Sequence, residues 1–442
     1  MNNLIKIIEQ AGIVGFGGAG FPTHIKLNAQ YKNIIINAAE CEPLLEVDKK
    51  LLSYKADTLY FAITQLLQNT PAEKVIIGIK KKNTEYIKPL KNLIKKTDNI
   101  EILFLDDTYP AGDEHILVYE ILGKVTPEGS IPLELGAVVI NVETLYNIAR
   151  AIDGEKVTDT YLSVVGEVEN PKTMRVPIGT SILNVIKLCK VKNPEKIQVI
   201  EGGVMMGTLR NDLSYPVTKT TKGLIVLPEN HRVINRYKTT NNNIKKEANA
   251  VCCHCKMCTD TCPRYLLGHS IEPHKIMRTL FRETPIDNPT YRNAMYCCEC
   301  GICELIACPL FLSPRRINIM IKQQLQQAGI KFKTEKTSFK PRETRPFSRI
   351  PTTRIEHRLE LDRYRKITDF TENDIHPDSV KIFLKQHFGV PSIPIVKKGD
   401  KVKKGDLIAQ IPDGKLGANI HASIDGKVTK IDDDYMILSA LK

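Results

Sequence analysis

Ten of the twelve cysteines lie between residues 252 and 308, in two short runs. In the first run, CCHCKMCTDTCP, the spacing C-x2-C-x2-C-x3-C is followed by a proline. The cysteines in this pattern are Cys252, Cys255, Cys258 and Cys262. Three closely spaced thiolates can each bind one iron of a [4Fe–4S] cube, and the fourth cysteine then ligates a second cube. The run therefore predicts an electron-transfer site.

The second run, CCECGICELIACP, offers a second set of ligands, although its last gap is four residues instead of three. These are Cys297, Cys300, Cys303 and Cys308. Two such runs predict two cubes with crossed ligation. One cube is expected on Cys252, Cys255, Cys258 and Cys308, and the other on Cys297, Cys300, Cys303 and Cys262.

Neighbouring cysteines leave the ligand set partly open. Choosing Cys253 would leave only one residue before Cys255, so Cys252 is preferred. The same argument favours Cys297 over Cys298 without deciding between them. Structural zinc is the alternative metal, because C-x2-C pairs also form tetrahedral zinc sites. Zinc needs four ligands, whereas these runs supply eight, and this favours iron–sulfur clusters.

A glycine loop, GFGGAGFP at residues 15–22, is the second feature that could do chemistry. Its glycines have the G-x-G-x-x-G spacing of a dinucleotide-binding turn, which needs a strand before it and a helix after it. Here a helical pattern precedes the loop, and Pro22 delays the next helix. A Rossmann site is therefore disfavoured. Two alternatives are left. The loop could bind the phosphate of another cofactor through its backbone N–H groups, or it could be a purely structural glycine turn.

Four stretches together carry a resemblance: GFGGAGFPTHIK, NAAECEP at 37–43, YPAGDE at 109–114 and INVETL at 140–145. They resemble the flavoprotein subunit of respiratory complex I, and the resemblance implies one pocket for FMN with NADH stacked over it. A flavin accepts a hydride and releases single electrons, which is what one-electron clusters need. Phe16, Ala39 and Ile140 depart from the family pattern, which has arginine, an acidic residue and asparagine there.

The resemblance also implies roles for individual residues. Those implied near the flavin phosphate and ribityl chain are Gly17, Gly18, Gly20, Lys26, Asn141 and Thr144. Those implied to line the flavin are Asn37, Glu40, Tyr109, Gly112 and Asp113. Phe21, Glu42 and Glu114 are implied to meet the nicotinamide nucleotide, with Glu42 and Glu114 as the catalytic pair.

The elements that must position these residues suggest several α/β and α+β domains. Residues 1–152 alternate helical and strand patterns and are expected to form the flavin domain. Residues 153–230 show a pattern of strands, a short helix and further strands, which is typical of a β-grasp domain, and their sequence resembles the soluble-ligand-binding domain that follows the flavin domain in this family. Residues 245–330 place the cysteines among helices, as in two-cluster ferredoxins. Short strands with Gly-Asp turns predict a small all-β domain at 371–442, and its sequence is similar to barrel-sandwich hybrid domains.

A basic segment, residues 331–370, separates the last two domains. Residues 331–366 hold 12 Lys/Arg and 5 Asp/Glu, a net charge of +7 within a total of +13. We interpret it as a solvated linker, with docking of an acidic partner or nucleic acid as alternatives. The 442-residue chain has no apolar stretch of the roughly 18 residues that cross a bilayer and no secretory signal. We therefore expect a cytoplasmic protein without a membrane span. Because nucleic acid is the least favoured interpretation of the basic segment, we expect no nucleic-acid partner.

Domain order narrows the resemblance. The RnfC component of Rnf electron-transport complexes has the same modules, but its barrel-sandwich segment precedes the glycine loop. The order here, with CPRYLLGHSIEPHKIMR and CPLFLSPRR, is similar to the cobalamin reductases of propanediol-utilisation microcompartments. This implies electron transfer from NADH through FMN and two cubes to the cobalt of a corrinoid. Cobalamin or an adenosyltransferase is the implied partner, microcompartment shell proteins are further candidates, and an Rnf-type component or an electron adaptor remain alternatives.

Overall fold

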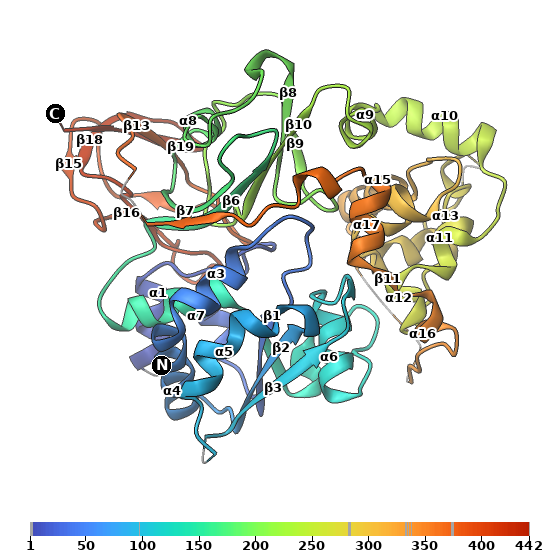
Figure 1. The fold of residues 1–442 in the computed structure, drawn as a ribbon, viewed down its shortest axis with the longest axis horizontal. Coiled ribbons are helices and arrows are strands. Elements are labelled where there is room, and N and C mark those ends of the chain that lie inside the picture. Colours follow the sequence, from blue (N-terminus) through green and yellow to red (C-terminus); the bar gives the residue numbers. More distant parts are fainter. Residues whose placement is uncertain are drawn as a thin grey trace.

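A computed structural model of the chain describes residues 3–96, 98–281, 284–331, 334, 336, 338–372 and 375–441. In Figure 1 the N-terminal α/β domain lies below, a mixed sheet and a C-terminal β domain lie above it, and the cysteine-bearing helices lie to one side. The predicted fold class, several α/β and α+β domains with an all-β C-terminal domain, is confirmed. Among the described residues, no helix combines the length and apolar character needed to cross a bilayer.

The N-terminal domain is built on a four-stranded parallel sheet in the order β3-β2-β1-β5. Its strands are nearly continuous apolar runs because helices cover the sheet. The strands are β1 (Asn33–Ala38), β2 (Lys74–Lys80), β3 (Ile100–Leu105) and β5 (Ala137–Asn141). The helices are α1 (Asn3–Gln10), α2 (Thr23–Leu27), α3 (Val47–Tyr54), α4 (Ala56–Asn69), α5 (Thr84–Leu93), α6 (Glu114–Leu122) and α7 (Val142–Ile152).

Residues 47–69 form two helices, α3 and α4, which separate at Lys55. Lys55 has φ −126° and ψ 30°, outside the helical region. Its Nζ lies 2.6 Å from Glu372 Oε2, so a tertiary ion pair accompanies the break.

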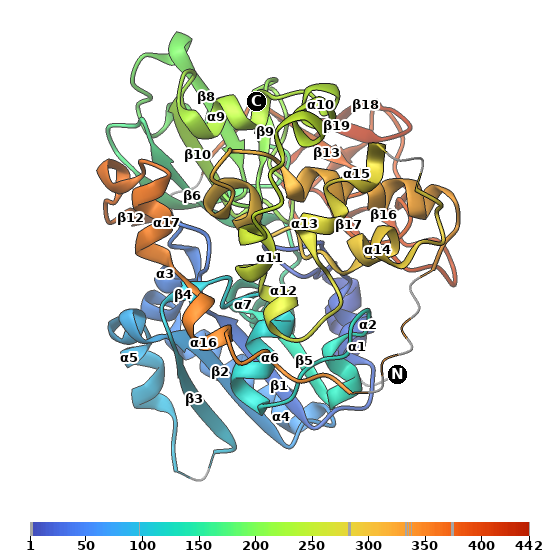
Figure 2. The same cartoon turned by 90° about the vertical axis from the view of Figure 1, so that its right-hand side faces the viewer.

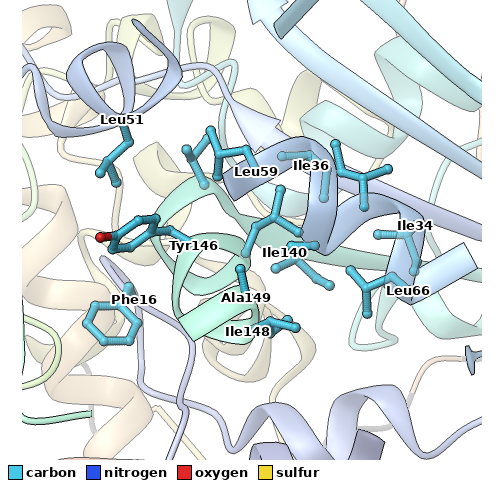
Figure 3. Packing of buried hydrophobic residues seen from close by; sticks show 14 of the residues in the cluster. Phe16, Ile34, Ile36, Leu51, Leu59, Leu66, Ile140, Tyr146, Ile148 and Ala149 are labelled. Atoms are coloured by element: carbon cyan, nitrogen blue, oxygen red, sulfur yellow. The ribbon is translucent and has the colours of Figure 1, made fainter. Parts of the chain in front are cut away.

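The core of this domain also fixes the glycine loop. Figure 3 shows Ile34 and Ile36 of β1 packed with Leu59 and Leu66 of α4, and Phe16 close to Tyr146 of α7. Phe16 is buried in this core, and its backbone N–H donates to Thr144 Oγ1 at 3.1 Å. An apolar side chain thus anchors the loop where the resembling family has arginine.

The second domain is a six-stranded mixed sheet in the order β12-β7-β6-β10-β8-β9. Strands β6 and β7 form an antiparallel hairpin, and β10 returns parallel to β6, in agreement with the β-grasp prediction. The elements are β6 (Asp159–Gly166), β7 (Lys172–Pro177), α8 (Ile182–Lys187), β8 (Ile197–Glu201), β9 (Thr208–Arg210) and β10 (Gly223–Pro228). The edge strand β12 (Asp369–Thr371) comes from the basic segment.

The interpretation of residues 331–370 as a solvated linker is wrong for its described part from residue 338 onward. Strand β11 (Ile350–Pro351) pairs with β4 (Thr108–Tyr109), and helices α16 (Arg345–Ser348) and α17 (Thr352–Arg358) flank it. Ile355 and Leu361 are completely buried. The arginines are partly neutralised by carboxylates, as in the pair of Arg349 with Asp106 at 2.9 Å. Figure 1 shows this segment crossing from the cysteine-bearing helices to the mixed sheet.

The cysteine-bearing domain is a group of short helices packed beside the two sheets (Figure 2). Its elements are α9 (Arg232–Lys238), α10 (Asn241–Val251), α11 (Met257–Asp260), α12 (Pro263–Leu266), α13 (Pro273–Ile276), α14 (Pro289–Arg292), a π-helical turn (Ile302–Ala307) and α15 (Pro314–Gln327). Proline begins four of these helices, where its missing N–H costs nothing.

The C-terminal domain consists of two small sheets, β13-β19-β18-β15 and β14-β16-β17. Its strands are β13 (Ser379–Phe383), β14 (Ile393–Pro394), β15 (Lys401–Val402), β16 (Leu407–Gln410), β17 (Ile420–His421), β18 (Gly426–Ile431) and β19 (Tyr435–Ala440). An apolar core that includes Ile382, Val428 and Leu438 lies between them. This agrees with the predicted barrel-sandwich architecture.

Lys219 joins three of the domains. The side chain is buried, and its Nζ donates to the carbonyl of Gly12 at 2.7 Å and to that of Asn419 at 2.6 Å. Its backbone N–H donates to Gln386 Oε1 at 3.0 Å. One residue of the β-grasp domain thus holds the flavin domain and the C-terminal domain together.

We expect Lys219→Met to destabilise the junction. One buried and one partly buried carbonyl would lose their donor, at about 1–3 kcal/mol each. Burial lowers the pKa of Lys219 to about 7, which shows that burying its ammonium group costs free energy. Methionine does not carry this cost, so part of the loss is offset. Thermal unfolding and limited proteolysis should show a lower midpoint and earlier release of the C-terminal domain. Lys385→Met, at an exposed position of the C-terminal domain, is the control. If both variants unfolded at the same midpoint, Lys219 would not hold the three domains together.

Candidate functional site

The glycine loop lies at the carboxyl edge of the parallel sheet. Gly15 N–H donates to the Phe21 carbonyl at 2.9 Å and closes the loop. Asn141, at the end of β5, caps α7 by accepting from Glu143 N–H at 2.8 Å. The loop contacts Thr144 in the first turn of that helix. Ligands of open parallel sheets bind outside this edge, so the layout suits a phosphate-bearing cofactor.

The loop glycines differ in their surroundings. Gly17 and Gly20 have φ of +68° and +69°, which disfavours any side chain. A Cβ at Gly17 would lie 2.9 Å from Lys222 Cδ. A Cβ at Gly18 would have no heavy atom within 4 Å. The backbone at Gly18 is therefore open to an approaching phosphate, which fits the implied flavin.

A buried charge network lies beside the loop. Lys222 Nζ is 2.5 Å from Asp48 Oδ2 and 3.3 Å from Glu40 Oε1, and Asn141 Nδ2 is 3.2 Å from Asp48. Burial and, to a smaller extent, neighbouring Glu40 raise the pKa of Asp48 to about 6. Asp48 and Glu40 in turn raise the pKa of Lys222. A fixed cation therefore stands next to the backbone that would receive a phosphate.

Sequence reasoning missed Lys222 and Asp48. Lys222 comes from the β-grasp domain just before β10, and Asp48 from the first turn of α3. Neither residue lies in one of the four matching stretches. Only the tertiary fold brings them to Gly17 and Glu40.

Asn37 and Gly112, which the resemblance implies to line the flavin, contact each other. Asn37 Nδ2 donates to the Gly112 carbonyl at 2.8 Å, and Gly112 N–H donates to Cys41 Sγ at 2.7 Å. A Cβ at Gly112 would lie 3.0 Å from Cys41 Sγ and 3.2 Å from Asn37 Oδ1. This close approach explains the glycine and joins the end of β1 to the loop before α6.

The implied phosphate lysine and one implied catalytic acid are paired with each other. Lys26 Nζ lies 2.8 Å from Glu114 Oε1, and both side chains are partly exposed. The pair can open toward a ligand at small cost, since exposed ion pairs contribute about 0–1 kcal/mol.

Glu42 lies against a turn of the β-grasp domain. Its two carboxylate oxygens accept from Met205 N–H and Met206 N–H, each at 3.0 Å. A Cβ at Gly203 would overlap this carboxylate. Burial raises the pKa of Glu42 to about 7. In the structure Glu42 thus positions the turn at residues 201–207, with the sequence EGGVMMG.

Gly20 and Phe21 contact the C-terminal domain. The Gly20 carbonyl accepts from Phe388 N–H at 3.0 Å, and a Cβ at Gly20 would lie 3.0 Å from His387 Cα. The Phe21 and Phe388 rings stack with centroids 5.9 Å apart and an interplanar angle of 28°.

All twelve cysteines are free thiols, and the ten of the two runs lie in two groups. One pocket is lined by cysteines of both runs, four from the first and one from the second: Cys252, Cys253, Cys255, Cys258 and Cys308. In the second group, burial raises the pKa of Cys262, and neighbouring Cys298 and Cys297 raise it further. Burial also raises the pKa of Cys303, with contributions from Cys297, from Cys258 of the first group and from Cys262. This grouping supports the crossed ligation, and Cys297 and Cys298 both stay candidates.

The second group lies next to the flavin domain. Tyr109 Oη donates to the Cys300 carbonyl at 2.7 Å. Arg264, two residues after Cys262, donates through Nη2 to Asp113 Oδ2 at 2.8 Å, and its side chain also hydrogen-bonds Cys298. Two implied flavin-lining residues therefore contact the cluster region directly. Sequence reasoning did not identify Arg264, whose position after the Cys-Pro step was the available signal.

The first group opens to solvent. Cys253 and Cys255 are exposed, and so are nearby apolar side chains, Met257, Leu310 and Phe311. The second group therefore lies next to the flavin domain, and the first group lies at the surface.

Glu143 gives a pH prediction. Its Oε1 accepts from Tyr161 N–H at 2.7 Å and from Thr160 Oγ1 at 3.0 Å, while its buried Oε2 has no partner among the described residues. Burial raises its pKa from 4.5 to about 8. The folded protein thus keeps a proton on Glu143 that the unfolded chain releases above pH 4.5. The free energy of unfolding therefore falls as the pH rises from 4.5 toward 8.

We expect Glu143→Gln to flatten this dependence, since the amide does not titrate. Between pH 5 and 9 the thermal midpoint of the variant should rise relative to that of the unmodified protein. The measurement is thermal unfolding across this range. Glu134→Gln, at an exposed position, should leave the slope unchanged, and parallel curves for Glu143→Gln would contradict the prediction.

Family models match three parts of the chain. Residues 8–150 match the Nuo51 FMN-binding domain, residues 251–313 a 4Fe-4S dicluster domain, and residues 363–440 the RnfC barrel sandwich hybrid domain. The predicted flavin, cluster and barrel-sandwich domains are thereby confirmed in kind.

Curated relatives match over nearly the whole length. The cobalamin reductases PduS of Citrobacter freundii and Salmonella typhimurium are each 38% identical over 427 residues, which is 96% of this chain and 94% of theirs. The C component of the Na(+)-translocating ferredoxin:NAD(+) oxidoreductase complex of Acetobacterium woodii is 33% identical over 59% of this chain and 58% of its own length. An NAD+-reducing [NiFe]-hydrogenase in the H2-reduced state shares the fold at TM-score 0.50 and 19% identity, over 74% of this chain and 62% of that one.

Proposed function

Because the chain belongs to the family of the cobalamin reductase PduS, we propose that it passes electrons from NADH, through FMN and two [4Fe–4S] clusters, to the cobalt of a corrinoid. The observation that carries this proposal is the contact between the two redox regions. Tyr109 and Asp113, which would line the flavin, form hydrogen bonds with Cys300 and with Arg264, which follows Cys262 in the chain. A flavin supplies the exchange between hydride and single electrons.

The residues of the chain divide this work. Backbone N–H groups around Gly18, with Lys222 and Lys26, would hold the flavin phosphate. Asn37 and Gly112 would shape the flavin pocket. Glu114, which is partly exposed and forms its ion pair with Lys26, would meet the nucleotide. Glu42 would act chiefly by holding the EGGVMMG turn in place.

We propose that electrons reach the cluster on Cys262, Cys297, Cys300 and Cys303 first. That group lies against the flavin domain and its thiols are mostly buried. Cys252, Cys255, Cys258 and Cys308 would hold the second cluster at the surface, where it would supply one-electron transfer to the acceptor. Exposed Cys255 and the pocket around this set support that order.

The proposed setting is the cytoplasm, within a bacterial microcompartment. The full-length similarity to PduS supports this setting, and it supports cobalamin as the acceptor. We propose a corrinoid adenosyltransferase as the protein partner that receives the reduced cobalt, and shell proteins as further contacts. The Rnf alternative is less specific, because that similarity covers 59% of the chain.

The test uses anaerobic protein loaded with flavin and clusters. NADH should bleach the flavin and then the cluster absorbance, and added hydroxocobalamin should be reduced with turnover. Flavin and clusters that stay oxidised with NADH would refute the reductase function and leave an electron adaptor. Reduction of viologen dyes without reduction of hydroxocobalamin would refute the corrinoid as acceptor.

A further inference from the structure

We propose that Phe388 of the C-terminal domain is part of the nucleotide site, and that the adenine ring of NADH stacks on the aromatic pair Phe21–Phe388. This inference rests on the proposed function and adds a binding residue from a different domain. The two rings already stack, with centroids 5.9 Å apart. Phe388 nevertheless keeps 54% of its surface exposed, so a flat face remains for a ligand.

The loop that carries Phe388 is held firmly in place. Gln386 and His387 are buried, and Gln386 Oε1 accepts from Lys219 N–H at 3.0 Å. His387 Nε2 lies 3.0 Å from the Val390 carbonyl and 3.1 Å from Ala418 N. Gly389 has φ of +126°, and a Cβ there would overlap the Leu416 carbonyl. The exposed ring therefore projects from a fixed backbone, which lowers the entropy cost of binding.

The backbone also ties the ring to the glycine loop. Phe388 N–H donates to the Gly20 carbonyl at 3.0 Å, two residues from the open Gly18. The same region thus offers backbone donors and cations for phosphates and an aromatic surface for a base. A nucleotide carries both groups, and stacking of a base on an aromatic ring is sequence-tolerant and substantial.

The variant Phe388→Ala distinguishes stacking on the adenine ring from a purely structural role of Phe388. Loss of a stacking partner should weaken NADH binding about tenfold, raising KM while kcat at saturating NADH is unchanged. Binding of ADP-ribose, measured by calorimetry, should weaken by the same factor. Reduced nicotinamide mononucleotide lacks the adenosine, so its rate of flavin bleaching should not change. Phe388→Tyr should restore binding of NADH and ADP-ribose.

Phe347→Ala is the matched control, because this phenylalanine is 90% exposed on α16 and should leave all three ligands unaffected. Unchanged ADP-ribose binding in Phe388→Ala, with NADH still bleaching the flavin, would overturn this inference and leave the proposed function intact. An equal loss with reduced nicotinamide mononucleotide would also overturn it, since the ring would then act on the fold. If the unmodified protein binds ADP-ribose but NADH fails to bleach its flavin, the proposed function fails instead.

Discussion

Replacing Cys308 by serine is expected to remove the cluster of the first cysteine run and to spare the cluster of its own run. The pocket lined by Cys308 is also lined by Cys252, Cys253, Cys255 and Cys258 of the first run, which supports a ligand set that crosses between runs, as in other two-cluster domains. Iron should fall from about eight to about four atoms per chain, since each cube holds four. NADH should still bleach the flavin, whereas hydroxocobalamin reduction should fall at least about 100-fold, because the surface cluster is the proposed exit.

Cys262→Ser is the complementary change. It should remove the cluster next to the flavin domain and leave the surface cluster intact but no longer reducible by NADH. Iron analysis and electron paramagnetic resonance of dithionite-reduced and NADH-reduced samples distinguish the two variants. Cys253→Ser, beside the first ligand and exposed, should retain both clusters. Loss of the same cluster in Cys308→Ser and Cys300→Ser would show that each run binds its own cube.

The 4Fe-4S domain was predictable because a metal cluster imposes short, fixed cysteine spacings on the chain. The same holds for the glycine loop, where Gly17 and Gly20 adopt backbone angles that favour glycine. The parallel strands were predictable from their apolar runs, since a sheet covered by helices needs such strands. In each case the physical demand is local, so a few neighbouring residues are enough to reveal it.

The parts that were missed depend on contacts distant in sequence. Lys222 reaches Asp48 across 174 residues, and Phe388 reaches Phe21 from the last domain. The basic segment looked solvated because charge dominates its composition, yet Ile355 and Leu361 bury it against other domains. No local pattern reports such packing, because the partner surface exists only in the folded chain.

Gly18→Val is expected to abolish tight flavin binding without harming the fold. A Cβ at this position meets no heavy atom within 4 Å, and Gly18 does not have the positive φ of its neighbours. The apo protein should therefore keep its thermal midpoint and both clusters. The added side chain would occupy the space through which a phosphate reaches the backbone. Loss of one or two charged hydrogen bonds, at about 1.5–3 kcal/mol each, should weaken FMN binding at least about tenfold.

Two further variants make this test specific. Gly18→Ala should have an intermediate effect on FMN affinity, measured by quenching of flavin fluorescence in the apo protein. Gly17→Ala should lower both FMN affinity and apo stability, because Gly17 has φ of +68° and its Cβ would lie 2.9 Å from Lys222 Cδ. If Gly18→Val bound FMN as tightly as the unmodified protein, the backbone around Gly18 would not bind the flavin phosphate. The charge on Lys222 would then serve only the buried carboxylates Glu40 and Asp48.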